Sequence, residues 1–406
     1  MAQASDSATM LALAEKILGQ VYRLDNHLKQ NFISQPCLAV GASTGLWSSH
    51  STSIESARSS IFGLTKQLIK LLVGPHEFLH EYVSSNWEHG ALYTLLEFNI
   101  LEKIPLDGKV HVSLLASQSG LPEKKLLSVL RLISCEGILD EVSEGVFGHT
   151  AISEELVRDE KFKAFIGFQL FETRVASAHL ADSMKVEASD YQTGQSAFKY
   201  AWGASMYDWH KAHPEKSTRF RMAMEGVTQS LDPGNALFFD WFKRNRNGDR
   251  ILVVDVEGRN TAFLADQFPA LSFETQVEKF KPQPTGDSDK VLLVYLVRNI
   301  LWNCSDEDCV KILQTFVPAM EKSPDTVLLV NEMMSPAGGI LERHVEKGYR
   351  RRDVTVMTMH NAKQRTEEEW KALFAKASPN FTFNVQTAST PHSYRGLWEV
   401  HLGLAK

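Results

Sequence analysis

From residue 250 onward, short apolar runs alternate with amphipathic segments, and this alternation constrains the fold more than any other feature. Continuous apolar runs suit strands buried on both faces, whereas the segments between them have helical spacing. The predicted strands are 251–256, 271–277, 290–297 and 326–333, and the predicted helices are 261–268, 306–320 and 365–377. We predict a doubly wound, mostly parallel α/β sheet, with 381–389 and 396–404 adding a hairpin.

The preceding part of the chain has helical periodicity. Residues 8–30 carry apolar positions on one helical face, and a Ser/Thr/Gly-rich loop follows. Residues 110–153 have the pattern of a winged helix, with two short helices and then a two-stranded ribbon with glycine at its turn. We therefore predict two domains, a helical and winged-helix domain over 1–205 and the sheet domain over 206–406.

Charge and cysteine content exclude several classes of function. The formal net charge is −6, and the predicted recognition helix at 123–134 has few cations, so we expect no nucleic-acid partner. The four cysteines form no CxxC pair, which predicts no metal site and reduced thiols. No run of about 20 apolar residues is present, so we expect a cytoplasmic protein that is not integral to a membrane.

Aromatic residues are dense between positions 160 and 230. Each ring taken alone is expected in a hydrophobic core. As a set, the rings also suit the wall of a pocket for a bulky apolar ligand.

Several blocks, taken in order, carry a resemblance to a known family. They are GHTAIS, YDWHKAHPEKSTRFRMAMEG, ILVVDVEG, YLVRNILWNCSDEDCVKIL, VLLVNEMMSP and DVTVMTMHNAKQRTEEEW. Together they resemble the fungal and plant small-molecule O-methyltransferases of class I, which use S-adenosylmethionine. The resemblance implies a C-terminal Rossmann-like methyltransferase domain with a seven-stranded sheet, an N-terminal winged-helix dimerisation domain, and a homodimer.

The turn that binds the cofactor departs from the family pattern. The family has a sequence similar to DVGGGxG after its first strand, because glycine lets the backbone approach the cofactor. Here Asp255 and Gly258 match, whereas the other positions carry side chains: Glu257, Arg259 and Thr261. Val277 stands where an acid usually binds the ribose. We expect S-adenosylmethionine binding to be impaired or lost, the alternative being a remodelled loop that still binds it.

The catalytic base is also replaced. The family pattern is similar to LRxILHDWSDEDC, whose histidine removes the proton of the acceptor hydroxyl. Trp302 stands in its place, and indole has no basic lone pair. Of the two supporting acids, Glu332 is retained and Gln364 replaces the other. The resemblance thus indicates a methyltransferase frame without methylating residues.

A fungal pericyclase subgroup of this family, similar to the leporin-forming enzyme, suggests what replaces methylation. Such enzymes dehydrate a 2-pyridone alcohol to a quinone methide and steer an Alder-ene or hetero-Diels–Alder closure. The resemblance implies the same activity here, on a polyketide- and peptide-derived substrate, with no cofactor required. Two alternatives stay open: a working O-methyltransferase with a degenerate loop, and a non-catalytic scaffold.

The predicted catalytic residues follow from this comparison. Arg298 is expected to contact substrate, or to pair with Asp306 or Glu307. His149 is expected to move a proton in the dehydration, or to be structural. Glu332 is expected to bind the pyridone or to pair with a cation, and Arg259 to supply a positive charge unless it is exposed.

The predicted substrate wall contains large apolar side chains chosen by their position in the blocks. Trp302 has the strongest individual claim, because it replaces a residue that faces substrate in the family. The full set is Trp202, Met206, Met224, Trp302 and Met357.

Overall fold

The computed structural model divides the chain into two compact units. Unit 1 contains residues 1–172 and 215–227, and unit 2 contains residues 173–214 and 228–406. The structure describes residues 9–42, 52–186, 195–230, 234–245, 250–257, 264–266, 268–269, 271–276, 278, 291–339, 341–390 and 393–403. Within these residues, no helix combines the length and the apolar character that crossing a bilayer requires.

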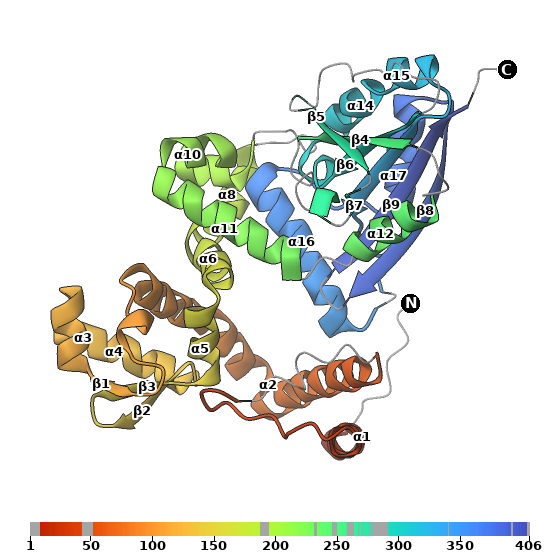
Figure 1. The fold of residues 1–406 in the computed structure, drawn as a ribbon. Helices are drawn as coiled ribbons and strands as arrows, with labels where there is room; N and C mark the ends of the chain where they lie inside the picture. Colours follow the sequence, from red (N-terminus) through yellow and green to blue (C-terminus); the bar gives the residue numbers. More distant parts are fainter. Residues whose placement is uncertain are drawn as a thin grey trace. The chain divides into compact units, whose positions relative to one another are not determined.

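Unit 2 is built on a mixed sheet with the strand order β5-β4-β6-β7-β9-β8 (Figure 1). The parallel strands are β4 (Arg250–Val256), β5 (Ser272–Gln276), β6 (Val291–Arg298) and β7 (Val327–Met333). The antiparallel hairpin of β8 (Phe381–Thr390) and β9 (Ser393–Leu402) pairs with β7. The predicted Rossmann-like fold is confirmed, with six strands among the described residues where the resemblance implied seven.

Helices cover both faces of this sheet and form its two cores. On one face, α14 and α17 bury side chains against β6, β7 and β9, and on the other face α12 does so. The predicted helix at 261–268 is described only in part, with helical residues at 264–266. The helices of unit 2 are α7 (Arg174–Ala178), α8 (Leu180–Val186), α9 (Ala197–Trp202), α10 (Met206–Ala212), α12 (Gly234–Arg244), η3 (Leu301–Asn303), α14 (Asp306–Gln314), α15 (Val317–Lys322), α16 (Arg343–His360) and α17 (Glu367–Ala377).

Unit 1 contains the predicted winged-helix pattern. Two helices lead into a ribbon whose turn holds Gly145 at φ +69°, a conformation that favours glycine. Leu126, Leu130 and Ile133 of α4 recur at helical spacing and are buried. The elements of this pattern are β1 (Lys109–His111), α3 (Val112–Ser119), α4 (Glu123–Cys135), β2 (Leu139–Ser143) and β3 (Val146–His149).

Further helices complete unit 1. The longest, α2, is kinked where Gly74 adopts φ +72° before Pro75. The short π-helical turn η2 is followed along the chain by residues of unit 2, and α11 returns the chain to unit 1. These helices are α1 (Met10–Gln30), α2 (Thr52–Glu97), η1 (Leu101–Lys103), α5 (Ala151–Arg158), α6 (Glu160–Phe168), η2 (Gln169–Thr173) and α11 (Pro214–Ser230).

An ion pair fixes the returning helix α11 within unit 1. Arg219 donates to the buried carboxylate of Glu172 at 2.5 Å, and its guanidinium also stacks over the rings of Tyr93 and Phe171. The chain therefore leaves unit 1 at Glu172 and re-enters it through α11. The predicted domain boundary between residues 205 and 206 stays a prediction. In the structure, each of the two compact units contains two separate stretches of the chain.

Candidate active site at the carboxyl ends of β6 and β7

The turn after β6 carries Trp302. It begins at Asn299, whose φ of +55° reverses the chain direction at low cost because asparagine tolerates the left-handed region. The turn continues as η3, and Ser305 then caps α14 by accepting from the backbone N–H of Asp308. Trp302 is thus presented between the end of a parallel strand and a capped helix.

Glu332 at the end of β7 holds the first half of this turn. Its Oε1 accepts hydrogen bonds from the backbone N–H groups of Ile300 and Leu301, both at 2.7 Å. The side chain is completely buried. One carboxylate oxygen therefore fixes the backbone immediately before Trp302.

Arg365 holds the second half of the turn. It donates to the backbone carbonyls of Leu301 (3.1 Å) and Cys304 (2.8 Å), and it pairs with Asp306 at 2.7 Å. Its guanidinium also lies over the ring of Trp370. Since a planar guanidinium has five donors in a fixed geometry, Arg365 satisfies several acceptors of the turn at once.

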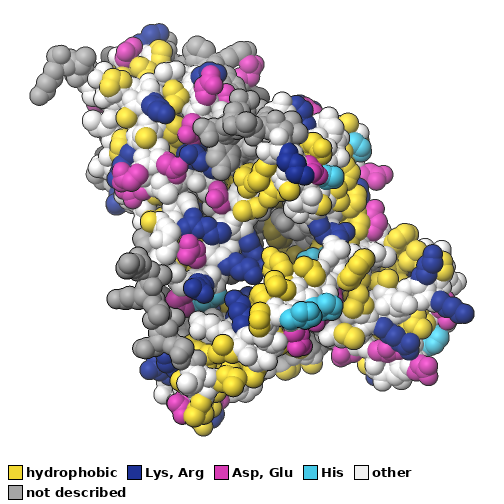
Figure 2. All heavy atoms as spheres, turned by 180° about the vertical axis from the view of Figure 1, so that it is seen from behind, with side chains coloured by type: hydrophobic (Ala, Val, Ile, Leu, Met, Phe, Trp, Pro, Cys, Tyr) yellow, Lys and Arg dark blue, Asp and Glu magenta, His cyan; other side chains and the backbone are white. Residues whose placement is uncertain are grey.

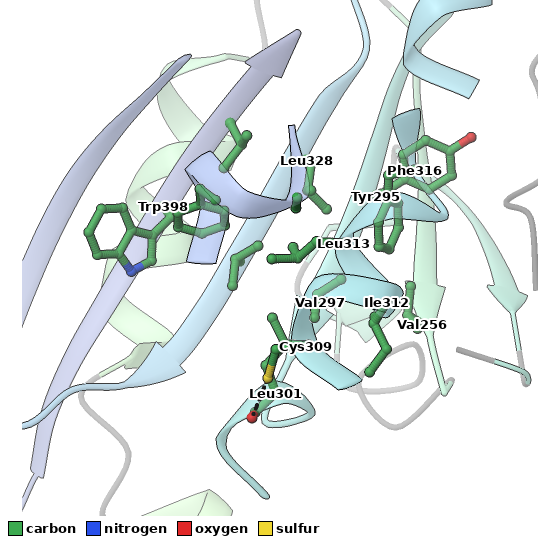
Figure 3. Packing of buried hydrophobic residues seen from close by; sticks show 14 of the residues in the cluster. Val256, Tyr295, Val297, Leu301, Cys309, Ile312, Leu313, Phe316, Leu328 and Trp398 are labelled. Carbon is green, nitrogen blue, oxygen red and sulfur yellow. Dashed lines mark hydrogen bonds between the residues drawn. The ribbon is translucent and has the colours of Figure 1, made fainter. Parts of the chain in front are cut away.

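The core beneath the turn adds a further anchor (Figure 3). The thiol of Cys309 donates to the carbonyl of Leu301 at 3.2 Å, and burial raises the pKa of this thiol so that it stays protonated. Leu301 packs in the same apolar cluster as Val297 and Ile312. The backbone under Trp302 is therefore fixed by a carboxylate, a guanidinium and a thiol. We call residues 299–304 with these three side chains the clamped turn.

Glu332 has unusual electrostatics because of its burial. Loss of hydration raises the pKa of its carboxyl to about 7, although the two backbone N–H groups, Arg395 and Arg365 act to lower it. Its second oxygen, Oε2, has no hydrogen-bond partner among the described residues. In the family this acid orients the histidine, whereas here it holds backbone.

Aromatic side chains from three elements meet at the clamped turn. The Trp302 ring contacts the His360 ring of α16 edge-on, with 5.6 Å between ring centroids and an interplanar angle of 80°. The ring of Tyr207 from α10 lies 5.6 Å from His360 on the same measure. Nδ2 of Asn303 donates to the hydroxyl oxygen of Tyr207 at 2.9 Å. We call Trp302, Asn303, Tyr207 and His360 the ring cluster.

The predicted substrate wall lies partly beside this cluster. Trp202 is at the end of α9, a helix that packs against α16, which carries Met357 and His360. The rings of Trp202 and Trp209 are 4.8 Å apart, and Met206 begins α10 as a buried side chain. Four residues of the predicted wall therefore belong to unit 2: Trp202, Met206, Trp302 and Met357. Met224 belongs to unit 1.

The three predicted catalytic residues do not share one unit. Arg298 is the last residue of β6, 1% exposed, and is in register with Asn331, the residue before Glu332. His149 belongs to unit 1, where it is buried and its two ring nitrogens pair with Ser153 Oγ (2.8 Å) and the Ile104 carbonyl (3.0 Å). These contacts give His149 of the GHTAIS block a structural role in the winged-helix region.

The predicted ion-pair partners of Arg298 have other cations. Asp306 pairs with Arg365 and Lys363, and Glu307 pairs with Lys311. Gln364, which replaces the second supporting acid, is buried, and its amide nitrogen donates to the sulfur of Met333 at 3.4 Å.

The described part of the cofactor turn departs from the glycine turn of the family. Asp255 is completely buried at the end of β4, and Glu257 follows at φ +64°, a conformation favoured by glycine. Where glycine would leave the backbone open, Glu257 adds a half-buried carboxylate close in sequence to Asp255. Gly258, Arg259, Thr261 and Val277 lie outside the described residues. Within the described part of the chain, no group of three His, Cys, Asp or Glu has metal-binding geometry.

Several residues of this site were missed by sequence reasoning, among them His360 and Arg365. His360 lies three positions after Met357, so helical spacing alone places both on one face of α16. Arg365 is adjacent to the position of Gln364, and only the fold shows that it reaches the turn after β6. Local spacing therefore offered a signal for His360 and none for Arg365.

Comparisons with known proteins agree with this architecture. A family model described as an O-methyltransferase domain matches residues 272–379. O-methyltransferase phnC of Penicillium herquei is 45% identical over 413 residues, which cover 93% of this chain and 96% of that protein.

Two solved structures share the fold. The crystal structure of OxaC has a TM-score of 0.72 at 16% identity, covering 96% of this chain and 100% of that chain. A structure described as "A Pericyclic Reaction enzyme" has a TM-score of 0.68 at 15% identity, covering 95% of this chain and 100% of that chain. At such identities the likeness shows the fold alone, whereas the similarity to phnC extends over almost the whole sequence. The chain therefore belongs to the fungal class I O-methyltransferase family.

Proposed function

We propose that the protein is a pericyclase of fungal secondary metabolism that works without methyl transfer and without a required cofactor. The observation that carries this proposal is the clamped turn, which presents an indole where the family presents a base. The proposed substrate is a 2-pyridone alcohol of polyketide and peptide origin. It would be dehydrated to a quinone methide, which then closes by an Alder-ene or hetero-Diels–Alder reaction.

The chemistry of Trp302 suits such a reaction. Its indole Nε1 is buried and has no hydrogen-bond partner among the described residues, so it is a donor that a substrate carbonyl can accept from. A donor aimed at a carbonyl stabilises the negative charge that develops there, and aromatic walls restrict the reacting geometry. Arg298, buried at the end of β6, is the proposed second source of positive charge. The solved neighbour described as a pericyclic reaction enzyme supports the assignment by analogy of fold.

A second candidate is an O-methyltransferase that acts on a polyketide or phenolic acceptor. The observation in its favour is the similarity to phnC, which is described as an O-methyltransferase. This activity requires that the turn at Glu257 still admits the methyl donor and that a residue other than Trp302 removes the proton.

One experiment separates these functions. The purified protein is incubated with a 2-pyridone alcohol, and separately with labelled S-adenosylmethionine and phenolic or pyridone acceptors. We expect faster consumption of the alcohol and an altered product ratio, with no label transferred. Transfer of label above background would overturn the proposal, and product mixtures identical with and without protein would favour a scaffold.

The variant Trp302→Phe tests the indole donor directly. Phenylalanine keeps an aromatic ring and removes the N–H group, so we expect the rate to fall on the order of 100-fold, as for removal of one donor from an oxyanion site. Trp241→Phe is the matched control, because Trp241 is a buried tryptophan of α12 in the core on the other face of the sheet from the clamped turn. Equal rates for both variants would rule out the donor role.

We propose further that the protein is a homodimer through α1 and α2, in a reducing cytoplasm. Unit 1 exposes many large apolar side chains on these helices: Leu11, Leu18, Tyr22, Phe62, Leu71, Leu72, Leu79, Tyr82, Val83 and Trp87. The face seen in Figure 2 has apolar patches with charged side chains of both signs between them. Sedimentation of Leu72→Asp and Leu79→Asp variants checks the assembly, and an unchanged mass would contradict this interface.

The four described cysteines are free, in keeping with a reducing cytoplasm.

A further inference from the structure

We infer that His360 is the catalytic residue that takes up and returns the proton during dehydration. This inference rests on the proposed function. It concerns a residue outside the family's base position: the histidine lost at position 302 is replaced by one supplied from α16.

The placement of His360 is determined by its helix. It is the last residue of α16, and Asn361 ends the helix in the left-handed conformation at φ +52°, with its N–H bonded to the carbonyl of Met357. The preceding turn is anchored by Val356 and Met359, which are buried. The ring of His360 itself is half-buried, so it can meet a ligand and exchange protons with water.

The surroundings of His360 are those of the proposed substrate site. Its ring contacts Trp302, the residue that stands in the base position, and lies beside Tyr207, which Asn303 holds by a hydrogen bond. Indole, phenol and amide groups do not accept protons at neutral pH, whereas imidazole does. In the ring cluster, imidazole is thus the group suited to general acid–base work.

Glu332 is less suited to this step. Its Oε1 already accepts two backbone hydrogen bonds, and the carboxyl is completely buried beneath the turn. Taking Glu332 as a proton carrier would disturb the turn that positions Trp302. The geometry assigns Glu332 to positioning and His360 to proton transfer.

The proposed step balances without any added reagent. The neutral imidazole of His360 takes the proton of the ring hydroxyl of the substrate, and the electrons of that O–H bond form the new carbonyl. The ring π electrons shift to form the exocyclic C=C bond, and the C–O bond of the alcohol breaks. The departing hydroxide receives the proton from the imidazolium, so that one water leaves and His360 returns to its starting state.

Three variants test the inference. His360→Phe keeps an aromatic ring and removes the base, so we expect dehydration to slow by about 100-fold or more. His360→Ala is expected to be slow as well, and to recover rate when imidazole is added to the assay. His344→Gln, at the other end of α16, is the matched control and should retain the full rate.

The readouts keep the two proposals distinguishable. Closure of a chemically generated quinone methide should proceed equally in His360→Phe and the unmodified protein, because that step transfers no proton to the residue. If the unmodified protein dehydrates the alcohol and His360→Phe does so at the same rate with the same thermal midpoint, the inference is wrong while the proposed function stands. If the unmodified protein leaves the alcohol unchanged, the proposed function is wrong, and so is the inference that rests on it. If His360→Phe shows no thermal unfolding transition, it is not folded and His360→Ala is used in its place. A His360→Ala variant whose rate does not recover with added imidazole would count against the inference.

Discussion

The ends of β4 and β6 are neighbours in one sheet, and both turn through a residue in the left-handed conformation. At β6 this residue is Asn299, which tolerates the conformation and whose side-chain oxygen accepts from Arg395. At β4 it is Glu257, in a position where the family has glycine and where a β-carbon costs about 1 to 2 kcal/mol. The turn after β6 has a suitable residue and several anchors, whereas at the end of β4 a glutamate adopts a conformation that favours glycine.

This difference predicts how the two turns respond to substitution. Around Trp302, the side chains of Glu332, Arg365 and Cys309 all hold the backbone of the turn. Replacement of the glycine at position 257 left a strained backbone. We therefore expect substitutions in the clamped turn to cost stability and activity, and reversion at β4 to gain stability.

The largest effect is expected for Arg365→Leu. The substitution leaves the carbonyls of Leu301 and Cys304 without this donor and Asp306 without its closest cation, which should reduce the free energy of unfolding by about 3 to 5 kcal/mol. Urea denaturation measures the change. Arg221→Leu on α11 is the control, because its pair with Glu225 is exposed, and it should cost less than about 1 kcal/mol. Equal losses for the two variants would show that the turn is not clamped.

The second effect is a pH dependence due to Glu332. Its pKa is raised from 4.5 to about 7 in the folded state, so its protonated form favours folding. That contribution is complete below the unfolded pKa and is lost as the pH rises through about 7, an overall loss on the order of 3 kcal/mol. Glu332→Gln retains an acceptor at the Oε1 position and cannot titrate. Its free energy of unfolding should therefore vary less between pH 4.5 and 7.5 than that of the unmodified protein, and parallel curves would contradict this account.

The smallest effect is expected at the other turn. Glu257→Gly relieves the left-handed conformation and should raise the free energy of unfolding by about 1 kcal/mol. Glu274→Gly in strand β5 is the control with the opposite sign, since glycine in a regular strand costs about 0.5 to 1 kcal/mol. Calorimetric titration with S-adenosylmethionine adds a second readout. We expect Glu257→Gly to bind S-adenosylmethionine more tightly than the unmodified protein does. A destabilised Glu257→Gly would mean that the carboxylate has taken on a structural role.

The sheet was predictable because its signal is local. Apolar runs such as 251–256 and 326–333 each specify a buried strand without reference to other elements, and the structure has β4 and β7 there. The substitution at Trp302 was visible because an intact motif surrounds it. The roles of Glu332 and Arg365 were not predictable, because their partners at Ile300, Leu301 and Cys304 are peptide groups, which leave no trace in a sequence.

The ion pair between Arg219 and Glu172 has a consequence for how the protein is made. The two residues are 47 positions apart, and a stretch of unit 2 lies between them along the chain. At about 5 to 20 residues per second, a ribosome adds the guanidinium roughly 2 to 9 seconds after the carboxylate. During that interval Glu172 has no such counter-charge, and the binding face for α11 is still uncovered. Unit 1 therefore cannot be completed as the first product of synthesis, and a nascent chain stalled near residue 200 would present a chaperone with an unfinished domain.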